Sequence, residues 1–129
     1  MELTQTSLKR LKGVHPDLVR VVVRTAKDWV DPDVSFVVTC GVRSVEEQKI
    51  LVSKGFSKTM RSRHLPQKDG MSHAVDLAIL LKGKLTWDWP AYKRLSDRVK
   101  AAAKAESVAI EWGGDWVTFK DGPHFQLRR

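Results

Sequence analysis

The chain has 129 residues, of which 42% are hydrophobic and 29% charged, with a net charge of +8. No apolar run approaches the ~20 residues needed to cross a membrane, and a single cysteine, Cys40, excludes an internal disulfide and a thiolate-rich zinc site. The charge predicts a polyanionic partner, either nucleic acid or an anionic envelope, but the basic residues are scattered and show no nucleic-acid-binding signature.

Two helices and a strand are predicted in the first half of the chain. His15-Pro16-Asp17 begins a helix, because proline suits the first turn and aspartate suits the positive end of the helix dipole. The apolar, β-branched segment 35–40 predicts a strand. Ser44 and Glu47 have capping-box spacing and predict a helix that ends near Gly55.

The second half is predicted to begin with a loop over residues 56–71, which are rich in glycine, proline and charge. A strand over 74–81 and a long helix from Trp89 to about Glu106 follow. Glycine turns separate three short C-terminal strands, at 108–111, 117–119 and 124–127. The order predicts one α+β domain over residues 1–129, with a small antiparallel sheet and flanking helices.

Asp76 occupies an unusual position in the strand over 74–81. Period-2 alternation places Val75 on one face and Asp76 on the other, between Ala74 and Ala78. An acid between two alanines has space beside it, as a functional carboxylate requires. A solvated or salt-bridged aspartate is the alternative.

Asp121 and His124 form a second candidate cluster. A straight strand would send residues three apart to opposite faces, but Gly122-Pro123 can bend the chain and direct both side chains toward one point. After the bend, His124 and Gln126 share a face. A structural histidine in a tight turn is the alternative.

Together the two clusters supply the parts of a catalytic zinc site. Such a site needs three nitrogen or oxygen ligands, an open position for water, and a group that accepts the proton of that water. The cluster of Asp76 also includes His64 and His73 earlier in the chain. Two histidines and Asp76 can therefore be the ligands, with Asp121 as the base. The HExxH helix of thermolysin-like peptidases is absent.

These residues resemble a zinc peptidase family that includes phage L-alanyl-D-glutamate endolysins and the D-alanyl-D-alanine carboxypeptidases and dipeptidases of vancomycin resistance. Its pattern S-x-H-x-x-G-x-A-x-D is similar to Ser62, His64, Ala74 and Asp76, and the closing acid and histidine are similar to Asp121 and His124. Segments 41–48 (GVRSVEEQ) and 111–116 (EWGGDW) also fit, the latter favouring the endolysin branch. The resemblance implies a D-Ala-D-Ala carboxypeptidase/hedgehog-like fold.

The resemblance also implies roles for particular residues. The zinc ligands would be His64, Asp76 and His124, and the catalytic base would be Asp121. Arg43 would stabilise the oxyanion or bind a substrate carboxylate, with a surface ion pair as the alternative. Further substrate contacts are expected from three residues: Ser62, Gln48 and Trp112.

The chain departs from the family pattern between the first two ligands. Eleven residues separate His64 from Asp76 where the pattern has six, and Ser72 replaces the expected glycine. His73 is therefore a rival ligand, although a regular strand would point it away from Asp76. A longer loop over 65–72 can return to the same point at little entropic cost, which favours His64.

Other candidates receive structural interpretations. Glu111 and Asp115 could each orient a ligand histidine. For Asp115, a turn residue is the alternative. Trp112 and Trp116 either line a substrate cleft or cover the core. We expect Cys40 to be inert in a buried strand and His15 to serve helix entry without binding metal.

The main prediction is a zinc-dependent endopeptidase that cleaves the L-alanyl-D-glutamate bond of peptidoglycan stem peptides, as a phage or prophage endolysin for host lysis. The alternatives are a D-alanyl-D-alanine carboxypeptidase or dipeptidase, and a non-catalytic basic module that binds wall or nucleic acid. Residues 1–13 contain no apolar segment, so we expect no export signal. The protein would then remain in the host cytoplasm until a holin-type pore releases it to the cell wall. We further expect a monomer with no separate wall-binding domain, which neither binds nucleic acid nor inserts into a membrane. Its positive charge would hold it on the anionic envelope.

Overall fold

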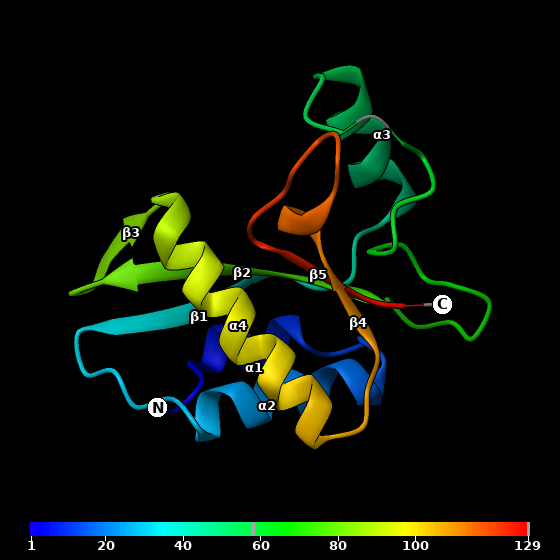
Figure 1. Ribbon diagram of the computed structural model, residues 1–129. Helices are drawn as coiled ribbons and strands as arrows, with labels where there is room; N and C mark the ends of the chain where they lie inside the picture. The colour runs from blue at the N-terminus through cyan, green and yellow to red at the C-terminus, as the bar shows by residue number, and fades with distance from the viewer. Residues whose placement is uncertain (58, 129) are drawn as a thin grey trace.

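In the computed structural model, which describes residues 1–57 and 59–128, four α-helices surround one sheet (Figure 1). The helices are α1 (Gln5–Arg10), α2 (Pro16–Lys27), α3 (Val45–Ser53) and α4 (Trp89–Ala105). The strands are β1 (Val34–Cys40), β2 (Ala74–Leu81), β3 (Lys84–Thr86), β4 (Ile110–Trp112) and β5 (His124–Leu127), and a short 3-10 helix, η1 (Gly113–Asp115), follows β4.

The sheet is antiparallel, with the strand order β1-β2-β5-β4 and with β3 also pairing with β2. The central strand β2 therefore lies between β1, from the first third of the chain, and β5, from its end. This arrangement confirms the predicted α+β class with a small antiparallel sheet and flanking helices.

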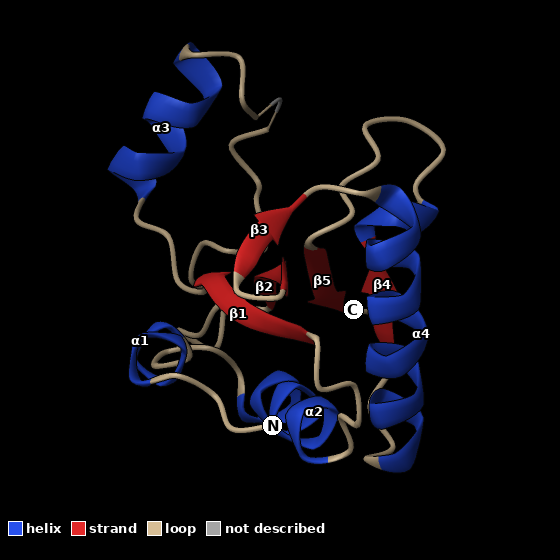
Figure 2. Cartoon of the chain, turned by 90° about the vertical axis from the view of Figure 1, so that its left-hand side faces the viewer, coloured by secondary structure: helices blue, strands red, loops and turns tan. Residues whose placement is uncertain are grey.

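Helices α2 and α4 pack against each other and cover one face of the sheet, as Figures 1 and 2 show. The predicted alternation of β2 is observed, since Val75, Leu77 and Ile79 are fully buried in the core. Tyr92 of α4 ties the helix to the β2–β3 hairpin, because its hydroxyl donates to the Thr86 carbonyl (2.8 Å) and accepts from the Ile79 amide (3.2 Å). The other face of β2, which carries Asp76, is left for the loops and α3.

Helix α3 stands apart from the other helices, on the opposite side of the sheet (Figures 1 and 2). Its predicted capping box is present, with the Ser44 hydroxyl accepting from the Glu47 amide (3.1 Å) and the Glu47 carboxylate accepting from the Ser44 amide (3.0 Å). None of the helices among the described residues has the length and apolar character of a membrane span.

Helix α1 and strand β3 were missed by the sequence patterns. Helix α1 buries only Ser7 and has no apolar stripe; it is held by the Thr4 cap and by the Ser7 hydroxyl, which accepts from the Val38 amide (3.0 Å). Strand β3 follows a tight turn in which Lys82 (φ 49°) and Gly83 (φ 79°) are both left-handed, as in a hairpin.

The strand predicted at 117–119 is wrong. Phe119 has φ 56°, outside the extended region, and Val117 is 94% exposed, so neither lies in a ladder. The segment instead loops out between η1 and β5, and the Asp121 amide returns to donate to the Gly113 carbonyl (3.0 Å). The C-terminal strands thus do not form a three-stranded meander, because β5 pairs with β2 on its other side.

Candidate functional site

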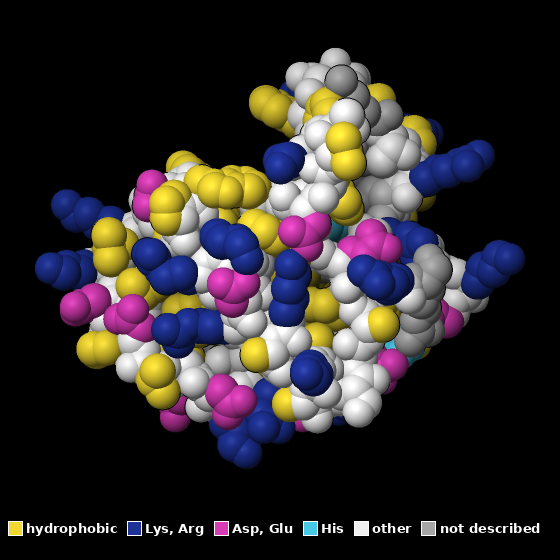
Figure 3. All heavy atoms as spheres, viewed as in Figure 1, with side chains coloured by type: hydrophobic (Ala, Val, Ile, Leu, Met, Phe, Trp, Pro, Cys, Tyr) yellow, Lys and Arg dark blue, Asp and Glu magenta, His cyan; other side chains and the backbone are white. Residues whose placement is uncertain are grey.

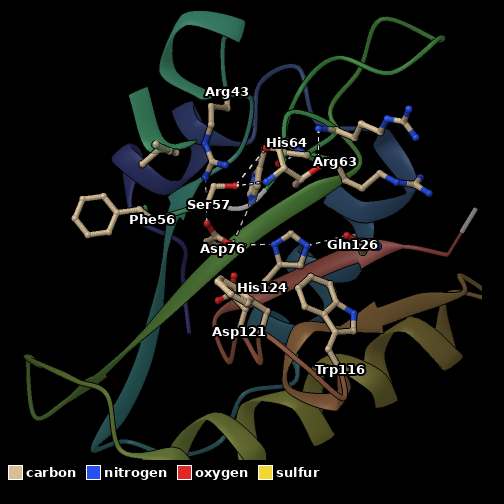
Figure 4. A pocket seen from close by; sticks show the side chains of 15 residues that line it. Arg43, Phe56, Ser57, Arg63, His64, Asp76, Trp116, Asp121, His124 and Gln126 are labelled. Atoms are coloured by element: carbon tan, nitrogen blue, oxygen red, sulfur yellow. Dashed lines mark hydrogen bonds and ion pairs between the residues drawn. The ribbon is translucent and has the colours of Figure 1, made fainter. Parts of the chain in front are cut away.

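A pocket of about 470 Å³ opens on the face of the sheet opposite α2 and α4. In Figure 3 the α3 region projects above the main body, with histidine atoms and acidic side chains at its base, while Lys and Arg are spread over the visible face. Figure 4 shows the polar centre of the pocket. That centre contains five predicted site residues: Arg43, His64, Asp76, Asp121 and His124.

Asp76 and His124 are brought together by the register of β2 and β5, in which they are directly opposite each other. The Asp76 carboxylate lies 3.3 Å from His124 Nδ1. Cross-strand neighbours on one face have their Cβ atoms within about 5.5 Å, so the register alone fixes this contact. The two alanines beside Asp76 are fully buried and leave its carboxylate exposed toward the pocket.

His64 reaches the same carboxylate from the loop before β2. Its Nε2 lies 3.2 Å from Asp76 Oδ1, on the other side of the carboxylate from β5, as Figure 4 shows. The Ser62 hydroxyl accepts from the His64 amide (3.2 Å), so Ser62 helps to fix the loop as well as lining the pocket. The longer 65–72 segment therefore does not displace His64 from Asp76.

Asp121 is directed into the pocket by the turn that precedes β5. The His124 amide donates to the Asp121 carbonyl (3.2 Å), which closes the bend over Gly122-Pro123. Gly113 makes the close approach possible, because a Cβ there would lie 2.4 Å from the Asp121 carbonyl oxygen. The expected convergence of Asp121 and His124 is therefore present.

The Asp121 carboxyl has a raised pKa. Burial is the main cause, and the negative charge of Asp76 adds to it. Ligand atoms of Asp76, Asp121 and His124 all lie within 4.8 Å of one another. Asp121 thus shares the pocket with Asp76 but holds its proton more readily, as suits a group that exchanges protons.

The far nitrogen of each imidazole has its own acceptor. His64 Nδ1 donates to the Gly41 carbonyl (2.8 Å), and His124 Nε2 donates to Gln126 Oε1 (2.9 Å). When both imidazoles are neutral, as metal ligation requires, these bonds leave His64 Nε2 and His124 Nδ1 as lone-pair donors facing Asp76, the arrangement that metal-ligating histidines adopt. Glu111 supports the second bond, since its carboxylate accepts from Gln126 Nε2 (3.5 Å).

The electrostatics of the cluster favour a cation. Burial disfavours the charged form of His64, but hydrogen bonds to Asp76 and Cys40 outweigh it and raise the pKa of His64 to about 10. Burial likewise disfavours the charged form of Asp76, yet its bonds with His124 and His64 hold the pKa of Asp76 well below its usual range. Two nitrogen donors and a persistent carboxylate are a donor set that fits a metal ion.

Arg43 lies beside the cluster, with its side chain 15% exposed and its Nη2 at 3.7 Å from Asp76 Oδ2. Gln48 positions it, since Gln48 Oε1 accepts from Arg43 Nη1 (2.8 Å) while Gln48 Nε2 donates to the Thr59 carbonyl (2.6 Å). Gln48 is fully buried and does not line the pocket. The structure therefore places Gln48 behind Arg43 rather than in the expected position of a direct substrate contact.

Cys40 lies closer to the cluster than expected. A shift in register between Val38 and Cys40 places Cys40 opposite Asp76 instead of on the core face. Its sulfur lies 3.6 Å from His64 Nδ1 and 3.4 Å from Arg43 Nη2, and the residue is half-buried. The expected buried position of Cys40 is wrong, because a local sequence pattern cannot reveal a bulge. That the thiol is inert stays a prediction.

The two C-terminal tryptophans have different positions. Trp112 is 2% exposed, donates to the Gly122 carbonyl (2.7 Å) and does not line the pocket, so the expected substrate contact is corrected to a core position. Trp116 lines the pocket, with its ring centroid 5.0 Å from that of His124. Asp115 lies at the surface, where it pairs with Lys100 (2.7 Å).

His73, the rival ligand, belongs to a separate group. Its Nε2 donates to Asp69 Oδ2 (2.7 Å), and its ring packs edge-on against His15 with centroids 5.2 Å apart. His15 caps α2 as expected, with Nδ1 accepting from the Asp17 amide (3.0 Å). The geometry places His64, and not His73, beside Asp76.

Comparison with known sequences assigns the chain to a family. A family model described as phage L-alanyl-D-glutamate peptidase matches residues 1–127. The L-alanyl-D-glutamate peptidase of Listeria phage A118 is 39% identical over 113 residues, covering 86% of this chain and 37% of that protein. The peptidoglycan L-alanyl-D-glutamate endopeptidase CwlK of Bacillus subtilis is 31% identical over 102 residues, covering 73% and 61%. The chain thus spans between about a third and three fifths of the length of these curated relatives.

Solved structures agree with this assignment. The Serratia marcescens L-Ala D-Glu endopeptidase ChiX superposes with a TM-score of 0.86 and 41% identity, covering 99% of this chain and 90% of that one. The vancomycin-resistance D,D-dipeptidase VanXYg, at a TM-score of 0.50 and 17% identity over 88% of this chain and 50% of that one, shares the fold. The chain belongs to the phage L-alanyl-D-glutamate peptidase family.

Proposed function

We propose that the chain is a zinc-dependent endopeptidase that hydrolyses the L-alanyl-D-glutamate bond of peptidoglycan stem peptides. The observation that carries the proposal is the convergence of His64 and His124 on the Asp76 carboxylate, with Asp121 and Arg43 in the same pocket. The names of the relatives supply the bond and the substrate class.

His64, Asp76 and His124 would hold the metal. Two imidazoles and a carboxylate are a donor set that suits zinc. A bound zinc ion supplies Lewis acidity, which activates a water molecule for attack on the peptide carbonyl at neutral pH.

Asp121 is the group that moves protons in this proposal. Its raised pKa lets it accept a proton from the attacking water and deliver it to the nitrogen of the leaving glutamate. Arg43, held by Gln48, offers a fixed guanidinium for the oxyanion that forms at the carbonyl. The indole of Trp116 and the ring of Phe119 give the pocket apolar walls that partly exclude water.

Digestion of purified Gram-negative sacculi tests the function directly. We expect new C-terminal L-alanine and N-terminal D-glutamate ends by mass spectrometry, and none after treatment with a chelator. Release of D-alanine would indicate the carboxypeptidase alternative instead. No cleavage by metal-loaded protein would contradict the proposed activity.

Metal affinity should depend steeply on pH. His64 keeps a proton up to a pKa of about 10 in the metal-free protein, and a metal ligand must be neutral, so binding has to displace that proton. The affinity for zinc is therefore expected to rise about tenfold per pH unit between roughly pH 6.5 and 8.5. Competition titrations with a chromophoric chelator would measure it, and a flat profile would refute the protonation state assigned to His64.

We also propose a biological setting in host lysis by a phage. The Listeria phage relative supports this setting, and the net charge of +8 would help to hold the protein on an anionic envelope. Release by a holin-type pore would then give access to the wall.

A further inference from the structure

A second hollow, of about 790 Å³, adjoins the candidate active site. The segment Arg61–Arg63 lines both spaces and forms the rim between them. The far wall is formed by residues 65–69 of the 65–72 loop, the segment that is longer than in the family pattern. The longer loop therefore extends the site away from Asp76. In Figure 4 the side chain of Arg63, the neighbour of His64 in the chain, also points away from Asp76.

The loop is anchored by Asp69. Its carboxylate accepts from the Met71 amide (2.9 Å) and from His73 Nε2 (2.7 Å), and these bonds lower the pKa of Asp69. His15 Nε2 lies 3.9 Å from the same carboxylate. Because His15 Nδ1 accepts from the Asp17 amide, its proton is on Nε2, so this group suits a hydrogen-bonded clamp better than a metal site.

The hollow is cationic. Arg61, Arg63 and Lys68 line it, and Asp69, its acidic residue, already accepts hydrogen bonds from the loop and β2. Arg63 is also fixed at its backbone, where its carbonyl accepts from the His73 amide (2.8 Å) and from the Ser72 hydroxyl (3.3 Å). These bonds fix the backbone of Arg63, which directly precedes the ligand His64 in the chain, and the side chain of Arg63 lines the hollow.

The proposed substrate has a matching charge. A glutamate residue has two carboxyl groups, and only one can continue the peptide, so the other is a free carboxylate. In an L-alanyl-D-glutamate peptide this carboxylate lies on the leaving side of the scissile bond. Arginine binds carboxylates with two parallel hydrogen bonds, which makes the contact both strong and directional.

We propose that the rim formed by Arg61–Arg63 is the subsite for the free carboxylate of the D-glutamyl residue, and that the hollow beyond it, with Lys68, receives the rest of the stem peptide. The proposal rests on the proposed function and deepens it. Arg63 is the specificity-determining residue, because its backbone is fixed beside His64 and the residue is half-buried, while Arg61 and Lys68 are exposed and contribute less.

Two synthetic stem peptides test this subsite, one with the free glutamyl carboxylate and one with that group converted to a carboxamide. We expect the zinc-loaded wild-type protein to cleave the free form about 10- to 100-fold better in kcat/KM, mainly through KM, since a charge-assisted hydrogen bond is lost. Arg63→Gln should cleave both peptides with similar kcat/KM, and Arg63→Lys should restore part of the preference. Arg61→Gln and Lys68→Gln should show smaller losses.

Lys84→Gln is the matched control, because Lys84 is an exposed cation on β3 outside both hollows, and it should keep the full preference. Equal cleavage of both peptides by the wild-type protein, or full preference in Arg63→Gln, would overturn the subsite and leave the proposed function intact. Cleavage of neither peptide by the wild-type protein would instead contradict the proposed function.

Discussion

Replacing Asp76 or His124 by alanine is expected to abolish stoichiometric zinc binding and to lower peptidoglycan cleavage by more than about a hundredfold, since even partners behind metal ligands cost 10- to 100-fold in affinity. Asp76 has the larger expected effect, because its carboxylate contacts both His64 and His124. Without it, two buried imidazoles face each other with no negative charge between them. Zinc content of the dialysed protein and release of stem-peptide fragments would measure both losses.

Asp97→Ala is a suitable control for the aspartate variant. Asp97 is an exposed acid on α4 that pairs with Lys93 (2.7 Å) and does not line the pocket. It should retain zinc and activity, and thermal unfolding would show that each variant is folded. Full zinc occupancy in Asp76→Ala or His124→Ala would mean that the ligand assignment is wrong.

Replacing Asp121 by asparagine or alanine is expected to separate metal binding from catalysis. The variant should keep zinc, because His64, Asp76 and His124 remain, and asparagine also preserves the shape of the turn closed by the His124 amide. Turnover should fall by about 10²- to 10⁴-fold, the range for loss of a general acid–base group. Single-turnover rates on sacculi, measured with zinc content on the same samples, would show the separation.

The pH profile of the wild-type enzyme offers a second test of Asp121. Burial and the charge of Asp76 raise the pKa of Asp121, so the base is protonated, and activity lost, at a higher pH than for an ordinary aspartate. The acidic limb of kcat/KM should disappear in Asp121→Asn. Near-wild-type turnover in that variant would remove Asp121 from the mechanism.

Much of the fold follows from local sequence patterns. The alternation in 74–81, the capping box at Ser44 and the proline at the start of α2 each specify an element whose observed bounds match closely. Helix α1 was missed because its contacts are polar and distant in sequence, such as the bond between Ser7 and Val38. The buried position expected for Cys40 is likewise wrong, since a bulge in β1 changes the face on which Cys40 lies.

The sequence by itself determined which residue types could form the site. The residue patterns pointed to Asp76, Asp121 and His124, and the family resemblance implied His64. The Gly122-Pro123 bend explained how residues three apart could converge. Only the tertiary structure decided their mutual geometry. The β2–β5 register places Asp76 opposite His124. The loop between His64 and β2 is held by the hydrogen bond between Asp69 and His73, so His64 stays beside Asp76. The same long-range packing buries Gln48 and Trp112 away from the pocket, because burial depends on neighbours that no local pattern specifies.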